Sequence, residues 1–302
     1  MNNFWVITPF FNPAGYKNLP KNHAIFAKAL KDTGVNLLTV ELTFGESKPE
    51  ISDTHNVVRL KSNSVMWQKE RLINYGLEQL PASCSKFAWV DCDVLFEQPD
   101  WVAQTVKKLD TVDVVQLFKR VFYLPVGHEV YSGKHDIMLQ SVIWQNKTYR
   151  NWLTRRIDKE LPFSSPGFGW AANRSTFPNG LYDRNIVGSG DTFMVDCMLD
   201  SWSIHGFATK FTQNMKSHMH GWRATLPKIK YDYIPQSIYH LWHGSLKNRA
   251  YMDRHDILLE NDYDPMMDVT VQDNVLEWCS PKDKMHTDIK QYFFNRKEDE
   301  DV

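Results

Sequence analysis

The hydrophobic and polar positions of the first 120 residues alternate between two spacings. Apolar residues recur at helical spacing in three segments: NHAIFAKALKDTG (22–34), VMWQKERLINYGLEQLP (65–81) and DWVAQTVKKL (100–109). Short apolar runs typical of buried strands lie around them: FWVITPF (4–10), VNLLTVEL (35–42), NVVRL (56–60), KFAWVDCDVLF (86–96) and DVVQLF (113–118). Strands alternating with helices predict an α/β fold, with a mostly parallel, twisted sheet and helices on both faces.

Polar side chains gather where these predicted strands end. Phe10 precedes a loop rich in turn-forming residues, Glu41 ends the second strand, and Asp91 and Asp93 end a later one. Ligands bind outside the carboxyl ends of the strands in such sheets, and two carboxylates at a strand end can reach one ion. The Asp-x-Asp pattern also occurs at Asp262/Asp264 and at Asp299/Asp301. The pattern alone therefore does not separate an ion site from a turn that ends the strand.

Composition and charge exclude several classes of protein. The chain has 302 residues, of which 42% are hydrophobic and 24% charged, as in ordinary globular proteins. Its net charge of −1 gives no global field that would recruit nucleic acid or an anionic membrane. The four cysteines have no CxxC spacing, which argues against zinc and against a disulfide framework. No signal peptide is apparent and no apolar run approaches the roughly 20 residues of a membrane span, so a cytoplasmic protein is expected.

Two common phosphate-binding motifs are absent from the sequence. No G-x-G-x-x-G follows the first strand, and no G-x-x-x-x-G-K-[ST] occurs, so neither a dinucleotide site nor a P-loop is expected. A fold of this class can hold a diphosphate through a divalent cation instead. Closely spaced carboxylates suit Mg²⁺ or Mn²⁺, which bridge to phosphate oxygens and neutralise their charge.

Three later stretches carry a resemblance to a known family. They are GFGWAANRSTF (167–177), GLYDRNIVGSGDTFMVD (180–196) and IYHLWHGSLKNRAYMDRHDIL (238–258). Together with the Asp-x-Asp strand, their order resembles the GT-A fold glycosyltransferases, in particular the β-1,4-galactosyltransferase and polypeptide N-acetylgalactosaminyltransferase branch. HLWHGSLKNRAYMDR is also similar to a His-x-Trp-His-Gly and Arg-x-Tyr-x-x-Arg pattern of phage and giant-virus glycosyltransferases. The resemblance covers roughly residues 4–258.

The resemblance implies a set of functional residues. In that branch the Asp of a Gly-Gly-Glu-Asp motif is the catalytic base, which corresponds to Asp191, and a later His completes the metal site. This implies an Mn²⁺ or Mg²⁺ site formed by Asp91, Asp93 and His243. The donor, expected to be a UDP-sugar, would contact Thr8, Phe10, Asn12, Glu41, Lys69, Asn74, Asp91, Trp170, Lys247 and Arg249. The chain departs from the family at Gly190, which stands where the motif has Glu, so acceptor contacts cannot be carried over.

Several of these residues have another interpretation. Asp191 precedes an apolar run and is a candidate helix N-cap. His243 and Trp170 are equally candidates for core packing. His240 is an alternative metal ligand to His243. His218 and His220, in SHMHGW, form a rival histidine pair without a nearby carboxylate pattern.

The resemblance implies one GT-A domain over residues 1–290, with a nucleotide-sugar-binding half (1–120) and an acceptor and lid half (121–290). Residues 244–254 are expected to form a mobile lid, and the acidic residues 291–302 a disordered tail. The implied reaction is inverting transfer of a sugar to a hydroxyl acceptor. Candidate acceptors are a hydroxymethylated base in DNA, tracked by Arg150, Arg155 and Arg156, or a glycan or protein. A non-catalytic nucleotide-sugar-binding protein and a metal-dependent hydrolase remain alternatives.

Overall fold

The computed structural model describes residues 3–149, 163–201, 209–251 and 253–300. A seven-stranded sheet forms its centre, in the order β11-β6-β10-β4-β1-β2-β3. Its strands are β1 (Phe4–Phe11), β2 (Asn36–Phe44), β3 (Asn56–Ser62), β4 (Lys86–Val90), β6 (Val114–Gln116), β10 (Gly169–Asn173) and β11 (Tyr231–Tyr233). Strand β10 is antiparallel to β4 and β6, and the other neighbouring pairs are parallel. The α/β class predicted from the sequence is confirmed.

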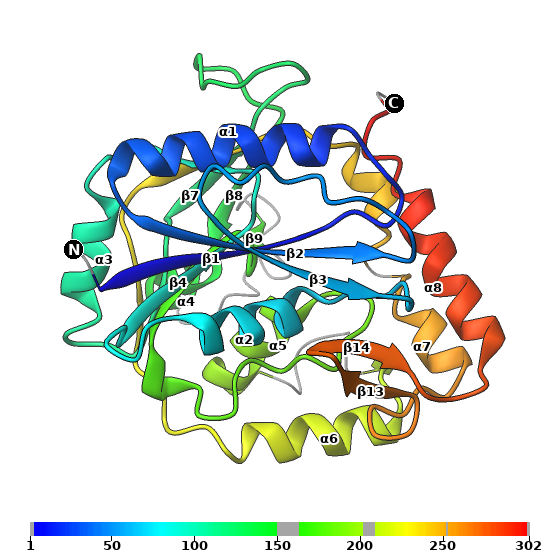
Figure 1. The fold of residues 1–302 in the computed structure, drawn as a ribbon. Coiled ribbons are helices and arrows are strands. Elements are labelled where there is room, and N and C mark those ends of the chain that lie inside the picture. Colours follow the sequence, from blue (N-terminus) through cyan, green and yellow to red (C-terminus); the bar gives the residue numbers. More distant parts are fainter. Residues whose placement is uncertain (1–2, 150–162, 202–208, 252, 301–302) are drawn as a thin grey trace.

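Helices cover both faces of the large sheet (Figure 1). Helices α1 (Asn18–Thr33) and α3 (Trp101–Lys108) bury apolar residues in the same core cluster on one face. Helices α2 (Lys69–Gln79) and α5 (Gly190–Leu199) pack in the cluster on the other face. Helix α1 ends as predicted at Gly34, whose φ of 70° is the left-handed conformation that glycine adopts freely.

A second, five-stranded sheet lies beside the first, in the order β5-β12-β7-β8-β9. Its strands are β5 (Val94–Phe96), β7 (Arg120–Tyr123), β8 (Ile137–Ser141), β9 (Ser164–Ser165) and β12 (Ser237–His240). The single strand predicted over residues 86–96 is therefore wrong. Strand β4 stops at Val90, and the chain enters the second sheet at Val94, where β5 pairs with β12. The Asp91–Asp93 turn consequently lies at the junction of the two sheets.

The predicted helix over residues 65–81 begins four residues later than expected, at Lys69. Tertiary hydrogen bonds hold the preceding residues outside the helix. The Trp67 amide donates to the Ile186 carbonyl at 2.9 Å, and the Gln68 side chain exchanges two bonds of 2.8 Å with the Leu276 backbone. These bonds outweigh the helical spacing of the apolar positions.

The remaining described elements belong to neither of these two sheets. They are α4 (Val142–Tyr149), the 3₁₀ turns η2 (Arg174–Thr176) and η4 (Leu246–Arg249), α6 (Gln213–Arg223), α7 (Asp256–Glu260), the β13–β14 hairpin (Val269–Gln272 and Val275–Trp278) and α8 (Asp283–Asn295). Within the described ranges, none of the helices has the length and apolar character needed to cross a membrane.

The prediction of a disordered acidic tail is wrong for the residues described. Helix α8 runs to Asn295, and both Arg296 and Glu298 after it are buried. The high charge of this segment suggested a solvated tail, but its charged side chains find partners inside the protein. Arg296 and Glu298 pair with each other, and the Asp299 carboxylate accepts from the backbone N–H groups at the start of α1.

Candidate functional site

A pocket of about 980 Å³ opens at the carboxyl ends of β1 and β4. Its wall includes the loop after β1, the Asp91–Asp93 turn, the start of α5, and the segment around η4. Residues after α8 complete the wall, so both ends of the described chain contribute to it. The pocket therefore lies where ligands bind in sheets of this kind.

Strand pairing brings a carboxylate and two histidines together at one side of the pocket. Strand β5 follows Asp93 directly and runs antiparallel to β12, which ends at His240, and the Leu241 amide donates to the Asp93 carbonyl at 2.8 Å. Asp93 Oδ2 then lies 2.8 Å from His243 Nε2 and 3.6 Å from His240 Nε2. One ligand atom from each residue lies within 4.8 Å of the others. These three side chains form the candidate cation cluster.

The cation cluster is buried, and two of its polar atoms lack partners. Asp93 Oδ1 and His240 Nδ1 make no hydrogen bond to any described residue. A buried polar atom without a partner is costly, which suits a site that receives a ligand. One carboxylate oxygen and two imidazole nitrogens are also donors that Mn²⁺ accepts, although three is fewer than the ion's usual number.

Two of the three groups in the cation cluster, Asp93 and His240, have the ionisation state that a divalent cation requires. Burial alone would raise the pKa of Asp93, but His240 and His243 beside it hold that pKa well below its usual value. Burial lowers the pKa of His240 to about 4, so its ring is neutral at physiological pH. A neutral imidazole and an ionised carboxylate are the forms that coordinate metals.

Lys69 connects Asp91 with Asp191 across the floor of the pocket. Its Nζ lies 2.6 Å from Asp91 Oδ1 and 2.8 Å from Asp191 Oδ2, and the lysine side chain is 8% exposed. Burial raises the pKa of Asp91 to about 6, although Lys69 acts in the opposite direction. Asp91 therefore pairs with Lys69 and is not one of the three residues of the cation cluster, and its metal-ligand role stays a prediction.

Asp191 is the second residue of α5 and is not its N-cap. The cap position is Ser189, which has φ 75° and makes no side-chain cap bond. A carboxylate in the first turn of a helix interacts favourably with the helix dipole. The Asp191 side chain is 16% exposed and lines the pocket, so it is accessible to a small ligand.

Gly190, where the family has Glu, adjoins another buried acid. A Cβ built at Gly190 would overlap the carboxyl group of Glu70, which comes from the first turn of α2. Burial raises the pKa of Glu70 to about 8, although Lys69 beside it acts in the opposite direction. The space that a side chain at position 190 would need is thus already filled by a largely protonated carboxyl group.

We expect Gly190→Ala to destabilise the protein by about 1–3 kcal/mol, because the new methyl group forces the buried Glu70 side chain to move. Gly221→Ala in α6 is a matched control, since a Cβ there meets no atom within 4 Å. That substitution is expected to stabilise by about 0.4–1 kcal/mol. Urea unfolding of both variants measures the difference. Equal stability of the two would show that Glu70 relocates without cost.

Three predicted donor-binding residues lie in the core and do not line the pocket. Thr8 Oγ1 donates to the Val90 carbonyl at 2.8 Å and links β1 to β4. The Asn74 side-chain N–H donates to the Leu181 carbonyl at 2.9 Å, and its Oδ1 accepts from the Leu181 amide at 2.7 Å. Trp170 is fully buried, and its indole N–H donates to the Pro166 carbonyl at 2.7 Å, which decides for core packing over contact with the donor.

Glu41 and Lys247 also lie outside the pocket wall. Glu41 is 1% exposed and accepts from the Ile51 amide at 3.0 Å and from Arg59 Nε at 3.1 Å. It therefore anchors the loop after β2, because a carboxylate at this buried position needs donors from its surroundings. Lys247 is exposed on η4 and is not among the residues that line the pocket.

The other predicted donor-binding residues, Phe10, Asn12, Lys69, Asp91 and Arg249, all line the pocket. Asn12 holds its loop closed by accepting from the Tyr16 amide at 2.9 Å. Of the rival histidines, His218 lies on α6 beside Tyr182 and neither it nor His220 belongs to the cation cluster. Arg150, Arg155 and Arg156, predicted to track DNA phosphates, fall outside the described residues.

Four pocket residues do not stand out in the sequence: Tyr16, Trp67, Arg296 and Glu298. Arg254 also lines the pocket, and its place in the polar stretch after His243 already indicates a cation that could contact a diphosphate. Glu298 belongs to a run of charges, which usually indicates a solvated surface. Burial would raise its pKa, but Arg296 and His243 hold that pKa well below its usual value.

No protein-family model and no curated protein sequence matches the chain. Solved structures with a distantly similar arrangement include glucosyl-3-phosphoglycerate synthase of Mycobacterium tuberculosis, at 14% identity and a TM-score of 0.41, covering 86% of this chain and 80% of that one. The catalytic domain of Drosophila β1,4-galactosyltransferase 7 in complex with xylobiose is 11% identical, with a TM-score of 0.38, and the match covers 83% and 98% of the two chains. These similarities are too low to assign an activity.

Proposed function

We propose that this chain is a metal-dependent glycosyltransferase that moves a sugar from a nucleotide-sugar, a UDP-sugar, to a hydroxyl acceptor with inversion. One observation carries the proposal. A single pocket at the strand ends holds the Asp93–His240–His243 cation cluster and, beside it, a separate carboxylate, Asp191, linked through Lys69 to the same Asp-x-Asp turn. A protein that only binds a nucleotide-sugar does not require the Asp191 carboxylate beside the cation cluster.

Asp93, His240 and His243 are the residues that we assign to Mn²⁺ or Mg²⁺. Bound there, the cation would supply Lewis-acid stabilisation of the diphosphate leaving group. The sequence left His240 and His243 as alternatives, and the geometry suits the use of both. Asp91 would act through Lys69, by fixing the amine that lies between the two aspartates.

Asp191 is the general base in this proposal. Lys69 holds its Oδ2 at 2.8 Å, and we assign the acceptor proton to the other carboxylate oxygen. The Gly188-Ser189-Gly190 turn before it includes a φ of 94° at Gly188, a conformation that glycine adopts freely, and the space beside Gly188 is occupied by the Arg254 guanidinium group. Attack by the acceptor oxygen on the face opposite the leaving group inverts the anomeric carbon.

Two arginines supply positive charge for the diphosphate. Arg249 and Arg254 are 7% and 5% exposed and line the pocket, and the Nε atom of each is without a hydrogen-bond partner among the described residues. Buried guanidinium groups need an anion or acceptors to offset their desolvation. Arginine also binds phosphate oxygens in pairs, so a diphosphate is the ligand that best completes this region.

We expect residues 244–254 to act as a lid. Arg249 Nη2 lies 3.0 Å from His243 Nε2, the atom that we assign to the cation. Because the guanidinium group and the cation cannot both occupy that position, Arg249 has to move when the cation binds. Tryptic cleavage after the exposed Lys247 should therefore slow when Mn²⁺ and a nucleoside diphosphate are added together. Cleavage after Lys228, exposed in the loop between α6 and β11, is the control. Parallel slowing at both sites, or at neither, would count against a lid.

A donor panel tests the proposed function as a whole. Common nucleotide-sugars are incubated with Mn²⁺ and with glycan, protein or hydroxymethylated DNA acceptors, and released nucleoside diphosphate is measured together with the sugar-bearing product. We expect release with one nucleotide class, dependent on the cation and stimulated by one acceptor. Free sugar as the sole product would favour a hydrolase. Tight donor binding without any release would favour a binding protein.

A further inference from the structure

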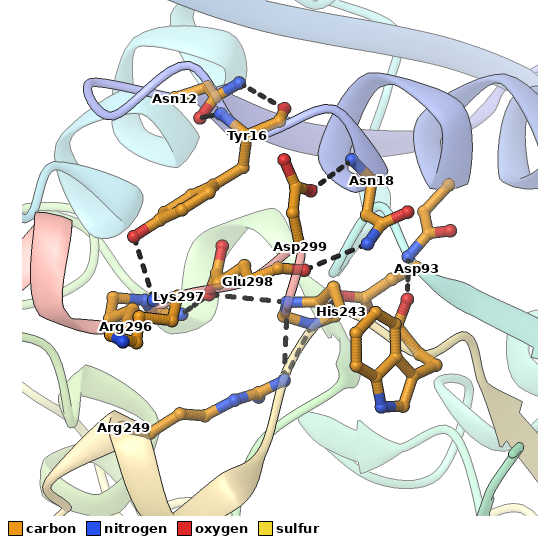
Figure 2. A network of polar contacts seen from close by, with 12 residues as sticks. Asn12, Tyr16, Asn18, Asp93, His243, Arg249, Arg296, Lys297, Glu298 and Asp299 are labelled. Atoms are coloured by element: carbon orange, nitrogen blue, oxygen red, sulfur yellow. Dashed lines mark hydrogen bonds and ion pairs between the residues drawn. The ribbon is translucent and has the colours of Figure 1, made fainter. Parts of the chain in front are cut away.

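The chain after α8 returns to the pocket and is fastened to the loop before α1 (Figure 2). The Lys297 amide donates to the Tyr16 hydroxyl at 2.9 Å. The Asp299 carboxylate accepts from the amides of Lys17 and Asn18 at 2.8 and 2.9 Å. The side chain of Asn18 donates to the Glu298 carbonyl at 3.0 Å. Four hydrogen bonds thus fix the backbone on both sides of Glu298.

The side chain of Glu298 points inward, to the back of the cation cluster. Its Oε1 lies 3.4 Å from His243 Nδ1 and 2.7 Å from Arg296 Nε. The residue is 2% exposed. The approach is close along the backbone as well, because a Cβ built at Gly244 would lie 2.8 Å from the Glu298 Cα. Gly244, with φ 86°, is the residue that allows the two segments to meet.

His243 therefore lies between two carboxylates. Its Nε2 faces Asp93 at 2.8 Å, and its Nδ1 faces Glu298 on the opposite side of the ring. Figure 2 shows Glu298 and Arg249 both reaching the same ring. A histidine that binds a metal through one nitrogen usually donates the N–H of its other nitrogen to a carboxylate, which fixes the tautomer and the ring orientation.

We propose that Glu298 is a positioning residue of the cation site: it accepts the Nδ1 proton of His243 and so keeps Nε2 available, beside Asp93, for a divalent cation. This rests on the cation site of the proposed function and adds to it a residue from outside the motifs. The stretch Arg296–Asp299 thereby becomes part of the site. Arg296 donates to the same Glu298 oxygen, Oε1, through both Nε and Nη2, and this contact orients the carboxylate toward His243.

The test measures Mn²⁺ binding to the full chain without any donor, by titration followed through the electron paramagnetic resonance of free Mn²⁺. We expect Glu298→Gln to weaken Mn²⁺ binding about 10–100-fold, the usual effect of losing a group that orients a metal ligand. Glu300→Gln is the matched control, because Glu300 lies two residues further, pairs with Lys297 at 3.0 Å, and is 61% exposed. Its Mn²⁺ affinity should equal that of the parent chain.

Unfolding in urea without metal distinguishes positioning from a purely structural role. A Glu298→Gln variant that is less stable yet binds Mn²⁺ as the parent does would overturn the proposal. Should this variant fail to fold, Glu298→Asp keeps the charge that pairs with Arg296 but draws the carboxylate back from His243. We then expect a folded protein with weakened Mn²⁺ binding, and parent-like binding would overturn the proposal. If the parent chain itself binds no Mn²⁺, the cation site of the proposed function is wrong, a separate failure.

Discussion

Asp93→Asn is expected to abolish turnover and to weaken Mn²⁺ binding more than about 100-fold. Asp93 is the only acid of the cation cluster, and its Oδ2 faces His243 at 2.8 Å and His240 at 3.6 Å. Losing a group that merely orients a ligand typically costs about 10–100-fold in metal affinity, and loss of a charged ligand should cost more. The amide keeps the shape and a carbonyl oxygen, so the change isolates the charge. Direct Mn²⁺ titration measures the affinity, and nucleoside diphosphate release measures turnover.

The control for this variant is Asp262→Asn. Asp262 belongs to the Asp262/Asp264 pair, a second Asp-x-Asp pattern whose residues are all described in the structure. Asp262 is exposed, and asparagine tolerates its left-handed φ of 46°. Unchanged Mn²⁺ binding and turnover are expected there. If Asp93→Asn binds Mn²⁺ as tightly as the parent while Asp262→Asn does not, the cation site belongs to the second pattern and Asp93 is not a ligand.

The order of strands and helices could be predicted because buried strands and amphipathic helices leave a local periodic signal. The pairing that builds the cation cluster leaves no such signal. The chain leaves the large sheet after β4, and β5 then pairs with β12, nearly 150 positions further along the chain. This pairing brings Asp93 and His240 together. Apolar residues lie on both sides of Asp91 and Asp93, so the pattern predicts one strand where the structure has two. Only the resemblance to a known family joined these residues in advance.

Polar residues at strand ends were harder to interpret from the sequence. Glu41 and Thr8 occupy positions where donor contacts were expected, but their side chains satisfy backbone groups of neighbouring segments. Glu298 presented the opposite difficulty, since a run of charges suggested solvent and concealed a buried carboxylate. In each case the partner is fixed by the folded structure and leaves no periodic signal in the sequence. That partner decides whether a buried polar group is structural or available for a ligand.

Asp191→Asn is expected to lower turnover by about 10² to 10⁴, the usual contribution of a general base. A hydroxyl acceptor is a poor nucleophile at neutral pH unless a base takes its proton during attack, and the amide cannot do so. The variant retains an oxygen that can accept from Lys69 Nζ, which lies 2.8 Å from Asp191 Oδ2 in the parent. The α5 helix and the Asp91–Lys69 pair should therefore survive, and donor affinity should stay close to that of the parent because the cation cluster is separate.

The matched control is Asp256→Asn, because Asp256 is also an acid in the first turn of a helix and pairs with Lys210 at 2.7 Å. It shares with Asp191 the loss of a helix-dipole interaction and of an ion pair, but it does not line the pocket. Rapid-quench measurement of product formation at saturating donor, with a separate donor-binding titration, separates chemistry from binding. Lost donor binding with residual turnover would make Asp191 a donor ligand, and an equal effect of both substitutions would make it structural. Slow product formation with intact donor binding, seen in Asp191→Asn alone, is the pattern that a general base requires.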